Sequence, residues 1–125
     1  MRILVVDDEQ VMRDLIFQVL RMKGHEIVLA TNGKEAVAQA AADSFDAIFL
    51  DAVMPELDGV EAFKQIQARD PHATVVIMTG FAVEDKIREA MALGAFDFLY
   101  KPFNIVELMT ILEKMKKRES LKPLT

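Results

Sequence analysis

The chain has 125 residues, of which 52% are hydrophobic and none is cysteine, and its 15 Lys and Arg against 20 Asp and Glu give a formal net charge of −5. This length suits a single domain with one core, and the lack of cysteine excludes disulfide scaffolds, thiol nucleophiles and Cys-ligated metal sites. The acidic balance argues against direct nucleic-acid binding. No apolar run approaches the roughly 20 residues of a membrane span. The apolar stretch near Met1 is too short for a signal peptide, so we expect a cytoplasmic protein without membrane contact.

Five short apolar runs, mostly β-branched or aromatic, predict strands that are buried on both faces. They are Ile3–Val6, Glu26–Ala30, Ala47–Leu50, Thr74–Met78 and Phe96–Tyr100. Each is followed by a segment with helical spacing of apolar residues, the first at roughly Val11–Lys23, and Asn104 with Glu107 resembles a capping box that opens the last one. The strict alternation predicts an α/β fold with one parallel sheet and helices on both of its faces.

The C-terminal end changes character, since from Lys114 onward the sequence becomes basic and polar. We therefore expect the folded domain to cover residues 1–118. Residues 119–125 are expected to form a polar tail, which is either the frayed end of the last helix or the start of a linker to another domain.

Polar side chains follow the apolar runs at the predicted carboxyl ends of the strands, where ligands bind in doubly wound sheets. Asp7 and Asp8 follow the first run, Asp51 the third, Thr79 the fourth and Lys101 the fifth. Three carboxylates crowded at one edge repel one another, and a divalent cation would relieve that repulsion. Because oxygen ligands favour a hard ion, we expect Mg²⁺. Lys101 and Thr79 could then contact phosphate oxygens, which predicts phosphoryl transfer to a carboxylate.

These motifs resemble the receiver domains of bacterial two-component response regulators, over residues 1–117. The matching segments are Val5–Glu9, Leu50–Pro55 leading to Asp58 and Gly59, Met78–Gly80, and Gly94–Phe103. The resemblance implies a flavodoxin-like, doubly wound domain with five helices and a five-stranded parallel sheet in the order 2-1-3-4-5. It also implies a signalling switch rather than an enzyme.

The resemblance further implies a role for each polar residue at the sheet edge. Asp51 would accept a phosphoryl group from a histidine kinase or a phosphotransfer protein. Asp8 and Asp51 would bind Mg²⁺ directly, the backbone carbonyl of Val53 would supply a further ligand, and Asp7 would act largely through bound water. Lys101 would hold Asp51 before phosphorylation and a phosphoryl oxygen afterwards.

Switching in such domains depends on residues beside the phosphoacceptor. The resemblance also implies a cis peptide bond from Lys101 to Pro102, and the proline fits this, since cis bonds cost little only before proline. Thr79 is expected to move toward the new phosphoryl group, and Phe98 to rotate into the space that it leaves. The surface expected to change, and to meet a partner, is made by Val83–Leu93, Asp97–Tyr100 and Ile105–Leu112.

Two apolar positions predict how fast the phosphoryl group is lost, and the first helix offers a surface on which a kinase could dock. Val53 and Phe81 would flank the phosphoryl group, and neither can orient an attacking water, so we expect slow loss of the phosphoryl group. A phosphoryl lifetime of seconds would count against this. The first helix carries Met12, Leu15 and Ile16 near the site and could dock the helices of a kinase.

Three other functions compete with a receiver that controls a downstream output domain or target protein. A stand-alone phosphorelay intermediate has the same residues and stays an alternative, and phosphorylation could also drive homodimer formation. A haloacid-dehalogenase-like aspartyl-phosphate hydrolase would need a second Asp two residues after Asp51, where this chain has Val53. A flavodoxin-like electron carrier is disfavoured, because the acidic residues 7–9 would repel a flavin phosphate.

Overall fold

The computed structural model describes residues 1–80 and 84–121, in which five strands and five helices alternate. The strands are β1 (Arg2–Val6), β2 (Glu26–Ala30), β3 (Ala47–Asp51), β4 (Val75–Thr79) and β5 (Asp97–Tyr100). The helices are α1 (Gln10–Met22), α2 (Gly33–Ala42), α3 (Gly59–Arg69), α4 (Glu84–Ala92) and α5 (Ile105–Leu121).

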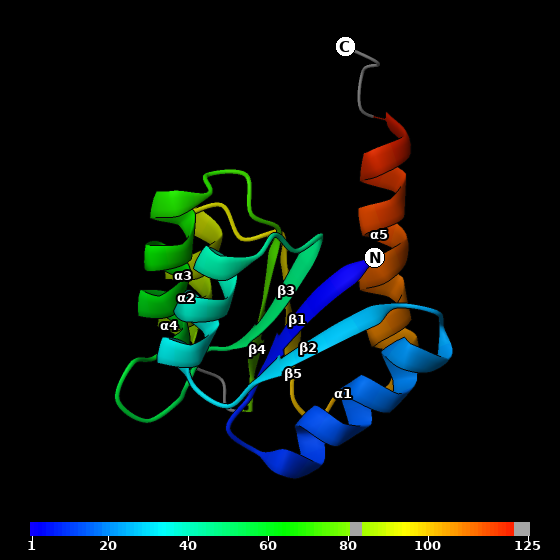
Figure 1. Ribbon diagram of the computed structural model, residues 1–125, viewed down its shortest axis with the longest axis horizontal. Coiled ribbons are helices and arrows are strands. Elements are labelled where there is room, and N and C mark those ends of the chain that lie inside the picture. Colours follow the sequence, from blue (N-terminus) through cyan, green and yellow to red (C-terminus); the bar gives the residue numbers. More distant parts are fainter. Residues whose placement is uncertain (81–83, 122–125) are drawn as a thin grey trace.

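One parallel sheet forms the centre of the fold, and its strand order is β2-β1-β3-β4-β5, as predicted. Helices α2, α3 and α4 cover one face of the sheet, while α1 and α5 cover the other (Figure 1). The order of the strands reverses between β1 and β3, and the site described below lies at the carboxyl ends of these two strands.

The alternation of side chains along each strand divides the core into two layers. Leu4, Leu50 and Ile77 pack toward α2, α3 and α4, where Phe63 is fully buried. The neighbouring residues in each strand point the other way and pack against Ile16 and Leu20 of α1 and against Leu108 and Leu112 of α5; they are Val5, Phe49 and Met78. Since β1, β3 and β4 have apolar neighbours on both faces, their sequences read as continuous apolar runs.

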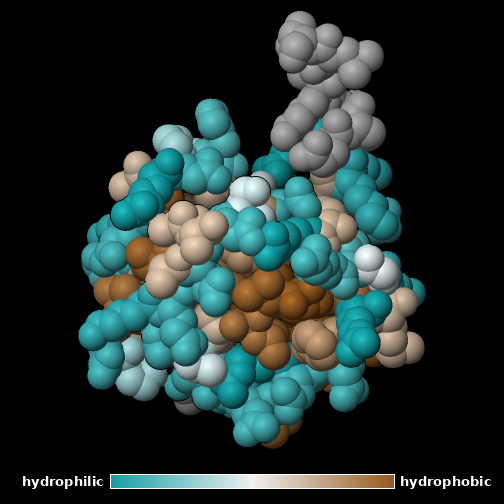
Figure 2. All heavy atoms as spheres, in the orientation of Figure 1, coloured by the Kyte–Doolittle hydropathy of each residue, from teal (hydrophilic) through white to brown (hydrophobic). Residues whose placement is uncertain are grey.

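The edge strand β2 is less covered than the central strands. Its residues Ile27, Val28 and Leu29 are half-buried, and Figure 2 shows an apolar area over this edge of the sheet, framed by hydrophilic side chains.

Polar side chains begin three of the helices. Asn32, Asp58 and Asn104 each accept a hydrogen bond from the backbone N–H three residues ahead, at 2.9, 2.9 and 2.8 Å, and so cap α2, α3 and α5. The cap predicted at Asn104 is thereby confirmed.

The observed boundaries differ slightly from the predicted ones. Strand β3 includes Asp51, which pairs with Met78, and β4 is shifted by one residue to include Thr79, which lies opposite Tyr100. Apolarity marks the buried part of a strand, whereas backbone pairing continues one residue into its polar end. Helix α5 reaches Leu121, past the boundary expected at residue 118. Phe81, Val83 and residues 122–125 lie outside the described residues, so the expectations for them stay predictions.

Candidate functional site

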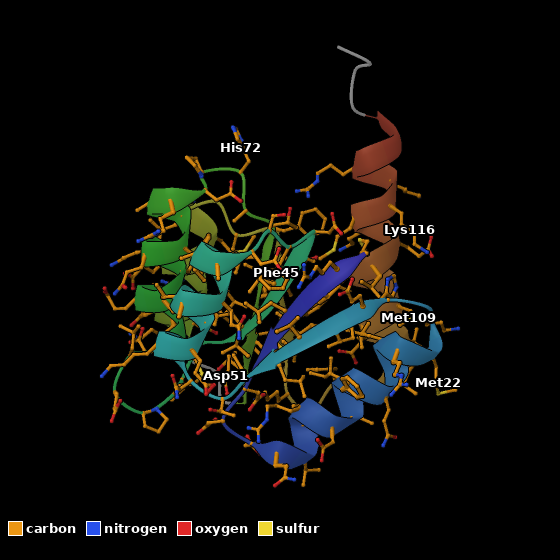
Figure 3. The ribbon with its side chains drawn as sticks, in the orientation of Figure 1. Met22, Phe45, Asp51, His72, Met109 and Lys116 are labelled. Atoms are coloured by element: carbon orange, nitrogen blue, oxygen red, sulfur yellow. The ribbon has the colours of Figure 1, made fainter. Side chains whose placement is uncertain are left out.

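The structure brings the predicted polar residues together at one end of the sheet. Figure 3 places Asp51 at this end, with Phe45 and His72 at the opposite end. Backbone hydrogen bonds align the chain here, because the N–H of Asp7 donates to Ala30 O at 3.2 Å and the N–H of Lys101 donates to Thr79 O at 2.7 Å. In-register parallel pairing thus carries side chains from distant parts of the sequence to the same edge.

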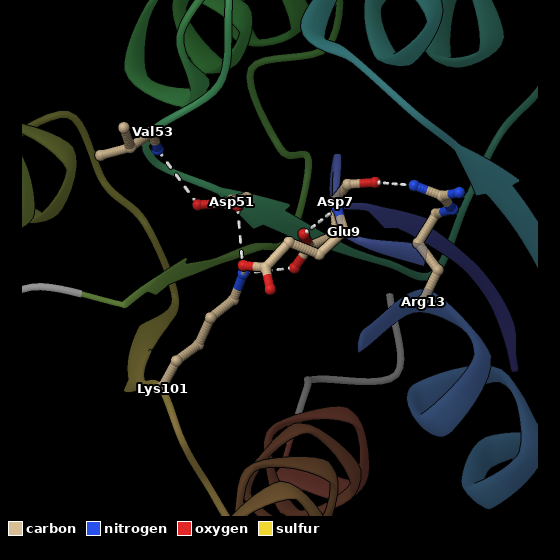
Figure 4. Close-up of polar contacts among 6 residues, drawn as sticks. All are labelled: Asp7, Glu9, Arg13, Asp51, Val53 and Lys101. Carbon is tan, nitrogen blue, oxygen red and sulfur yellow. Dashed lines mark hydrogen bonds and ion pairs between the residues drawn. The ribbon is translucent and has the colours of Figure 1, made fainter. Parts of the chain in front are cut away.

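Lys101 is the cation at the centre of this cluster. Its Nζ donates to Asp51 Oδ2 at 3.0 Å and also to Asp7 Oδ2 (Figure 4). All three side chains are buried, with exposed fractions of 7% for Lys101, 5% for Asp51 and 0% for Asp7. Burial alone would lower the pKa of Lys101, but the hydrogen bond to Asp7 and the charge of Asp51 outweigh it and raise this pKa above its usual value. The peptide bond between Lys101 and Pro102 is cis.

The carboxyl group of Asp51 has a strongly raised pKa. Burial raises its pKa to about 6, against the opposing effects of a hydrogen bond from the Val53 N–H, at 3.1 Å, and of the nearby Lys101 ammonium. The negative charge of Asp7 raises it further. A partly desolvated carboxylate whose pKa lies near neutral pH is well suited to bind a cation or to accept a phosphoryl group.

Asp7, Asp8 and Asp51 fit a divalent cation by the chemistry of their donors. One carboxylate oxygen from each of the three lies within 4.8 Å of the others, and Asp8 is exposed whereas Asp7 and Asp51 are buried. Among the residues that the structure describes, Lys101 is the one ammonium in contact with this group, so three ionised carboxylates leave an excess of two negative charges. An all-oxygen set that is open to water on one side suits Mg²⁺, which keeps several of its water ligands.

Two residues of the cluster were missed by reasoning from the sequence. The Glu9 N–H donates to Asp7 Oδ1 at 2.9 Å, and Glu9 Oε1 lies 3.7 Å from Lys101 Nζ. Arg13 Nη1 donates to the backbone oxygen of Asp7 at 2.7 Å and fixes the turn between β1 and α1. Glu9 directly follows the acidic pair, which could have drawn attention to it. Arg13 carries no such signal, because it reaches the turn only by the geometry of the helix.

The two residues expected to take part in switching, Thr79 and Phe98, lie on the neighbouring strands β4 and β5. Thr79 is fully buried at the end of β4. Phe98 is half-buried, packs against the core layer of α2, α3 and α4, and contacts the Tyr100 ring edge-on with the ring centroids 5.3 Å apart. Val53 keeps 49% of its surface exposed beside Asp51.

The loop after β3 approaches the first turn of α3 very closely. A Cβ atom added to Gly59 would lie 2.0 Å from Asp51 O and 2.7 Å from Ala52 Cα. Asp58, which caps α3, also forms an ion pair with Lys86 of α4 at 2.7 Å. The backbone of Asp51 is therefore packed against α3, and the cap of α3 is tied to α4.

An apolar groove lies between α1 and the start of α5. It encloses about 480 Å³, and Leu15, Ile16, Val19, Phe103 and Val106 are among the residues that line it. Over the part of the chain that the structure describes, no helix has the length and apolar character needed to cross a membrane.

Comparisons with known protein families and curated proteins point to one family. A family model described as "Response regulator receiver domain" matches residues 3–113. The chemotaxis protein CheY of Listeria monocytogenes is 37% identical over 118 residues, which cover 94% of this chain and 99% of that protein. The regulatory protein AtoC of Escherichia coli is 35% identical over 121 residues, which are 97% of this chain but only 26% of AtoC. The chain thus spans about a quarter of AtoC.

Solved structures agree with this match. A CheY-like response regulator receiver domain protein from Methanospirillum hungatei has a TM-score of 0.90 at 27% identity, covering 97% of this chain and 98% of that one. The response regulator protein TrrA from Thermotoga maritima, solved in complex with Mg²⁺-BeF, has a TM-score of 0.83 at 32% identity, covering 91% and 97% of the two chains.

Proposed function

This chain belongs to the response regulator receiver domain family, a family of signalling switches, and from that premise we propose that Asp51 is its phosphoacceptor. The observation that supports this proposal most directly is the contact of Lys101 Nζ with Asp51 Oδ2, at 3.0 Å, inside an acidic cluster. A buried carboxylate held by a buried ammonium, at the carboxyl end of a central strand, supports this role, because the ammonium can neutralise charge on an incoming phosphoryl group.

In the proposed reaction, the donor is a phosphohistidine of a histidine kinase or of a phosphotransfer protein. An oxygen of Asp51 forms the bond to phosphorus, and the bond from phosphorus to the donor nitrogen breaks. Lys101 transfers its hydrogen bond from Asp51 to a phosphoryl oxygen. Asp7, Asp8 and Asp51 would hold Mg²⁺ together with the backbone carbonyl of Val53, and the ion, when bound, neutralises charge on the phosphoryl oxygens.

The proposed output is a change in the surface around α4, β5 and α5. The phosphoryl group brings more negative charge and additional acceptor oxygens. The Thr79 hydroxyl donates to one of these oxygens, and Phe98 turns inward to fill the space beside it. Because Phe98 has no hydroxyl, it is held there by packing alone. Partners that recognise this surface are a downstream output domain, a target protein or a second copy of the chain.

The phosphodonor is proposed to dock at the groove between α1 and α5. Its apolar lining, with Leu15, Ile16 and Val106, is suited to the apolar face of a helix, and it lies beside the loop that carries Lys101. The net charge of −5 makes direct binding of nucleic acid by this domain unfavourable. We also propose that the protein acts in the cytoplasm, where histidine kinases present their phosphohistidine.

Loss of the phosphoryl group without a partner is proposed to be slow. The side chain of Val53 stands exposed beside Asp51 and offers no group that could orient or deprotonate water. The same feature disfavours an aspartyl-phosphate hydrolase, which would need an acid at this position. A stand-alone relay, which passes its phosphoryl group to another histidine, uses the same site and stays the alternative role.

The test is intact-mass measurement after incubation with phosphoramidate. We expect a single phosphoryl adduct that requires Mg²⁺, is absent from Asp51→Asn, and decays over minutes or longer after the donor is removed. A folded wild-type protein that binds Mg²⁺ and forms no adduct would refute the proposed function. An adduct on Asp51→Asn would place the phosphoacceptor elsewhere.

A further inference from the structure

A charged side chain that has no role in the proposed reaction, that of Glu9, lies on the solvent side of Asp51. Asp7, Asp51 and Lys101 are buried, but the Glu9 side chain is 66% exposed while its Oε1 lies 3.7 Å from Lys101 Nζ. Figure 4 shows the Glu9 side chain reaching across to the Lys101 ammonium. The bond from the Glu9 N–H to Asp7 Oδ1, at 2.9 Å, anchors its backbone.

The other side of the approach is apolar. Val53, whose N–H donates to Asp51 Oδ1, keeps 49% of its surface exposed. A donor that brings its phosphorus to Asp51 therefore passes a carboxylate on one side and a hydrocarbon side chain on the other. The leaving group of the donor stays on the solvent side, since the attacking oxygen and the leaving atom are in line. Glu9 is consequently placed to interact with the leaving group.

We propose that Glu9 selects phosphodonors by the charge of their leaving group, and that it favours a phosphoryl group carried on a cationic nitrogen over one carried on a carboxylate. This inference rests on the proposed function of Asp51 and concerns the class of donor that the same site accepts. Phosphoramidate and a protonated phosphohistidine belong to the favoured class, and acyl phosphates belong to the disfavoured one.

The two reactions differ in where charge goes. With phosphoramidate, an Asp51 oxygen forms the O–P bond, the N–P bond breaks, and its electron pair stays on nitrogen, which leaves as ammonia and takes a proton from water. The nitrogen is positive in the bound donor and partly positive while the bond breaks, so Glu9 attracts it throughout. With acetyl phosphate, the C–O–P linkage breaks at phosphorus and the electron pair leaves on acetate, so negative charge grows toward Glu9.

Coulomb's law gives the size of the effect. For charges roughly 6 Å apart near the surface, where the effective dielectric constant is high, one unit charge changes a rate by about threefold to tenfold. High salt screens this interaction, because Glu9 is exposed.

The experiment measures adduct formation by intact mass with phosphoramidate and with acetyl phosphate, at saturating Mg²⁺, for the wild type, Glu9→Gln, Glu9→Lys and Glu113→Gln. Glu113 is the matched control, since it is an exposed residue of α5 whose ion pair with Lys116 is long, at 3.9 Å. Isothermal titration with Mg²⁺ alone sets the saturating concentration for each variant, so that a change in ion affinity does not alter the comparison.

We expect the ratio of the phosphoramidate rate to the acetyl phosphate rate to fall about threefold to tenfold in Glu9→Gln. It should fall further in Glu9→Lys, stay unchanged in Glu113→Gln, and depend less on Glu9 in 1 M salt. Adducts that form in all variants at an unchanged ratio, or an equal change in Glu113→Gln, would overturn the inference and leave the proposed function standing. A wild type that forms no adduct with either donor would overturn both.

Discussion

Replacing Asp51, the proposed phosphoacceptor, by Asn should make the metal-free protein more stable. Burial raises the pKa of Asp51 from 3.8 to about 6, so the folded state binds a proton more tightly than the unfolded state does. The folded protein therefore loses stability as pH rises through the window between these two values, and the full loss is present at neutral pH. Asp51→Asn keeps the shape of a protonated carboxyl group and removes this loss.

The magnitude follows from linkage. A shift of about two pKa units corresponds to about 3 kcal/mol at pH 7.5, about 1.5 kcal/mol at pH 5 and about 0.5 kcal/mol at pH 4. We expect Asp51→Asn to exceed the wild type by these amounts in free energy of unfolding, measured by urea denaturation in EDTA. Asp14→Asn, which changes an exposed carboxylate of α1 that makes no hydrogen bond or ion pair with the other described residues, should stay within about 0.5 kcal/mol of the wild type.

Mg²⁺ supplies an independent check on the same reasoning. An ion that binds only the folded wild type stabilises it by about 2.7 kcal/mol at a hundredfold excess over its dissociation constant. The stability gap at pH 7.5 should therefore close when Mg²⁺ replaces EDTA. If Asp51→Asn is no more stable than the wild type at pH 7.5 in EDTA, or if its advantage does not shrink by pH 4, the electrostatic account of Asp51 is wrong.

Two further predictions concern the loop that leads from Asp51 to α3 and α4. Gly59→Ala would place a Cβ atom 2.0 Å from Asp51 O, and we expect a loss of at least about 2 kcal/mol in thermal or urea unfolding and a slower phosphorylation. Gly80→Ala is the control, because among residues 1–80 and 84–121 the nearest atoms to its Cβ would be those of Lys101, at 3.9 Å, and it should be tolerated. Equal losses in the two variants would contradict the steric argument. Asp58→Ala removes both a helix cap and an ion pair, whereas Lys86→Gln removes the ion pair alone. Asp58→Ala should therefore lower the free energy of unfolding by about 1 kcal/mol more than Lys86→Gln does. Equal losses in urea denaturation would show that the cap contributes nothing.

The fold could be predicted from the sequence because its central strands are buried on both faces. Residues such as Val5, Phe49 and Ile77 have exposed fractions of 0%, and runs of such residues have few alternatives to a covered parallel strand. The ends of the strands were harder to place. The backbones of Asp51 and Thr79 still pair with the neighbouring strands, while their side chains already belong to the site. A pattern of hydrophobic residues shows that these side chains are polar, but it does not show that the backbone pairing continues to them.

The members of the site could be predicted for a similar reason, but their contacts could not. Parallel strands bring their carboxyl ends to one edge, so Asp7, Asp51 and Lys101 had to be near one another. The sequence does not reveal that Lys101 would donate to Asp7 as well as to Asp51, because a lysine side chain has four rotatable bonds and can reach several oxygens. For the same reason, Glu9 was not recognised as a neighbour of Lys101.

The energetics of this edge indicate function rather than structure. A helix cap or a turn at the end of β3 could be made by an exposed residue at little cost, as Asn32 and Asn104 do elsewhere in the chain. Here the fold instead buries Asp51 and Asp7 beside Lys101, and the burial raises the pKa of Asp51 and costs stability at neutral pH. A divalent cation bound by these carboxylates would offset this cost, and it would also neutralise charge on a phosphoryl group. The buried charge imbalance is therefore the feature that links this fold to phosphoryl transfer.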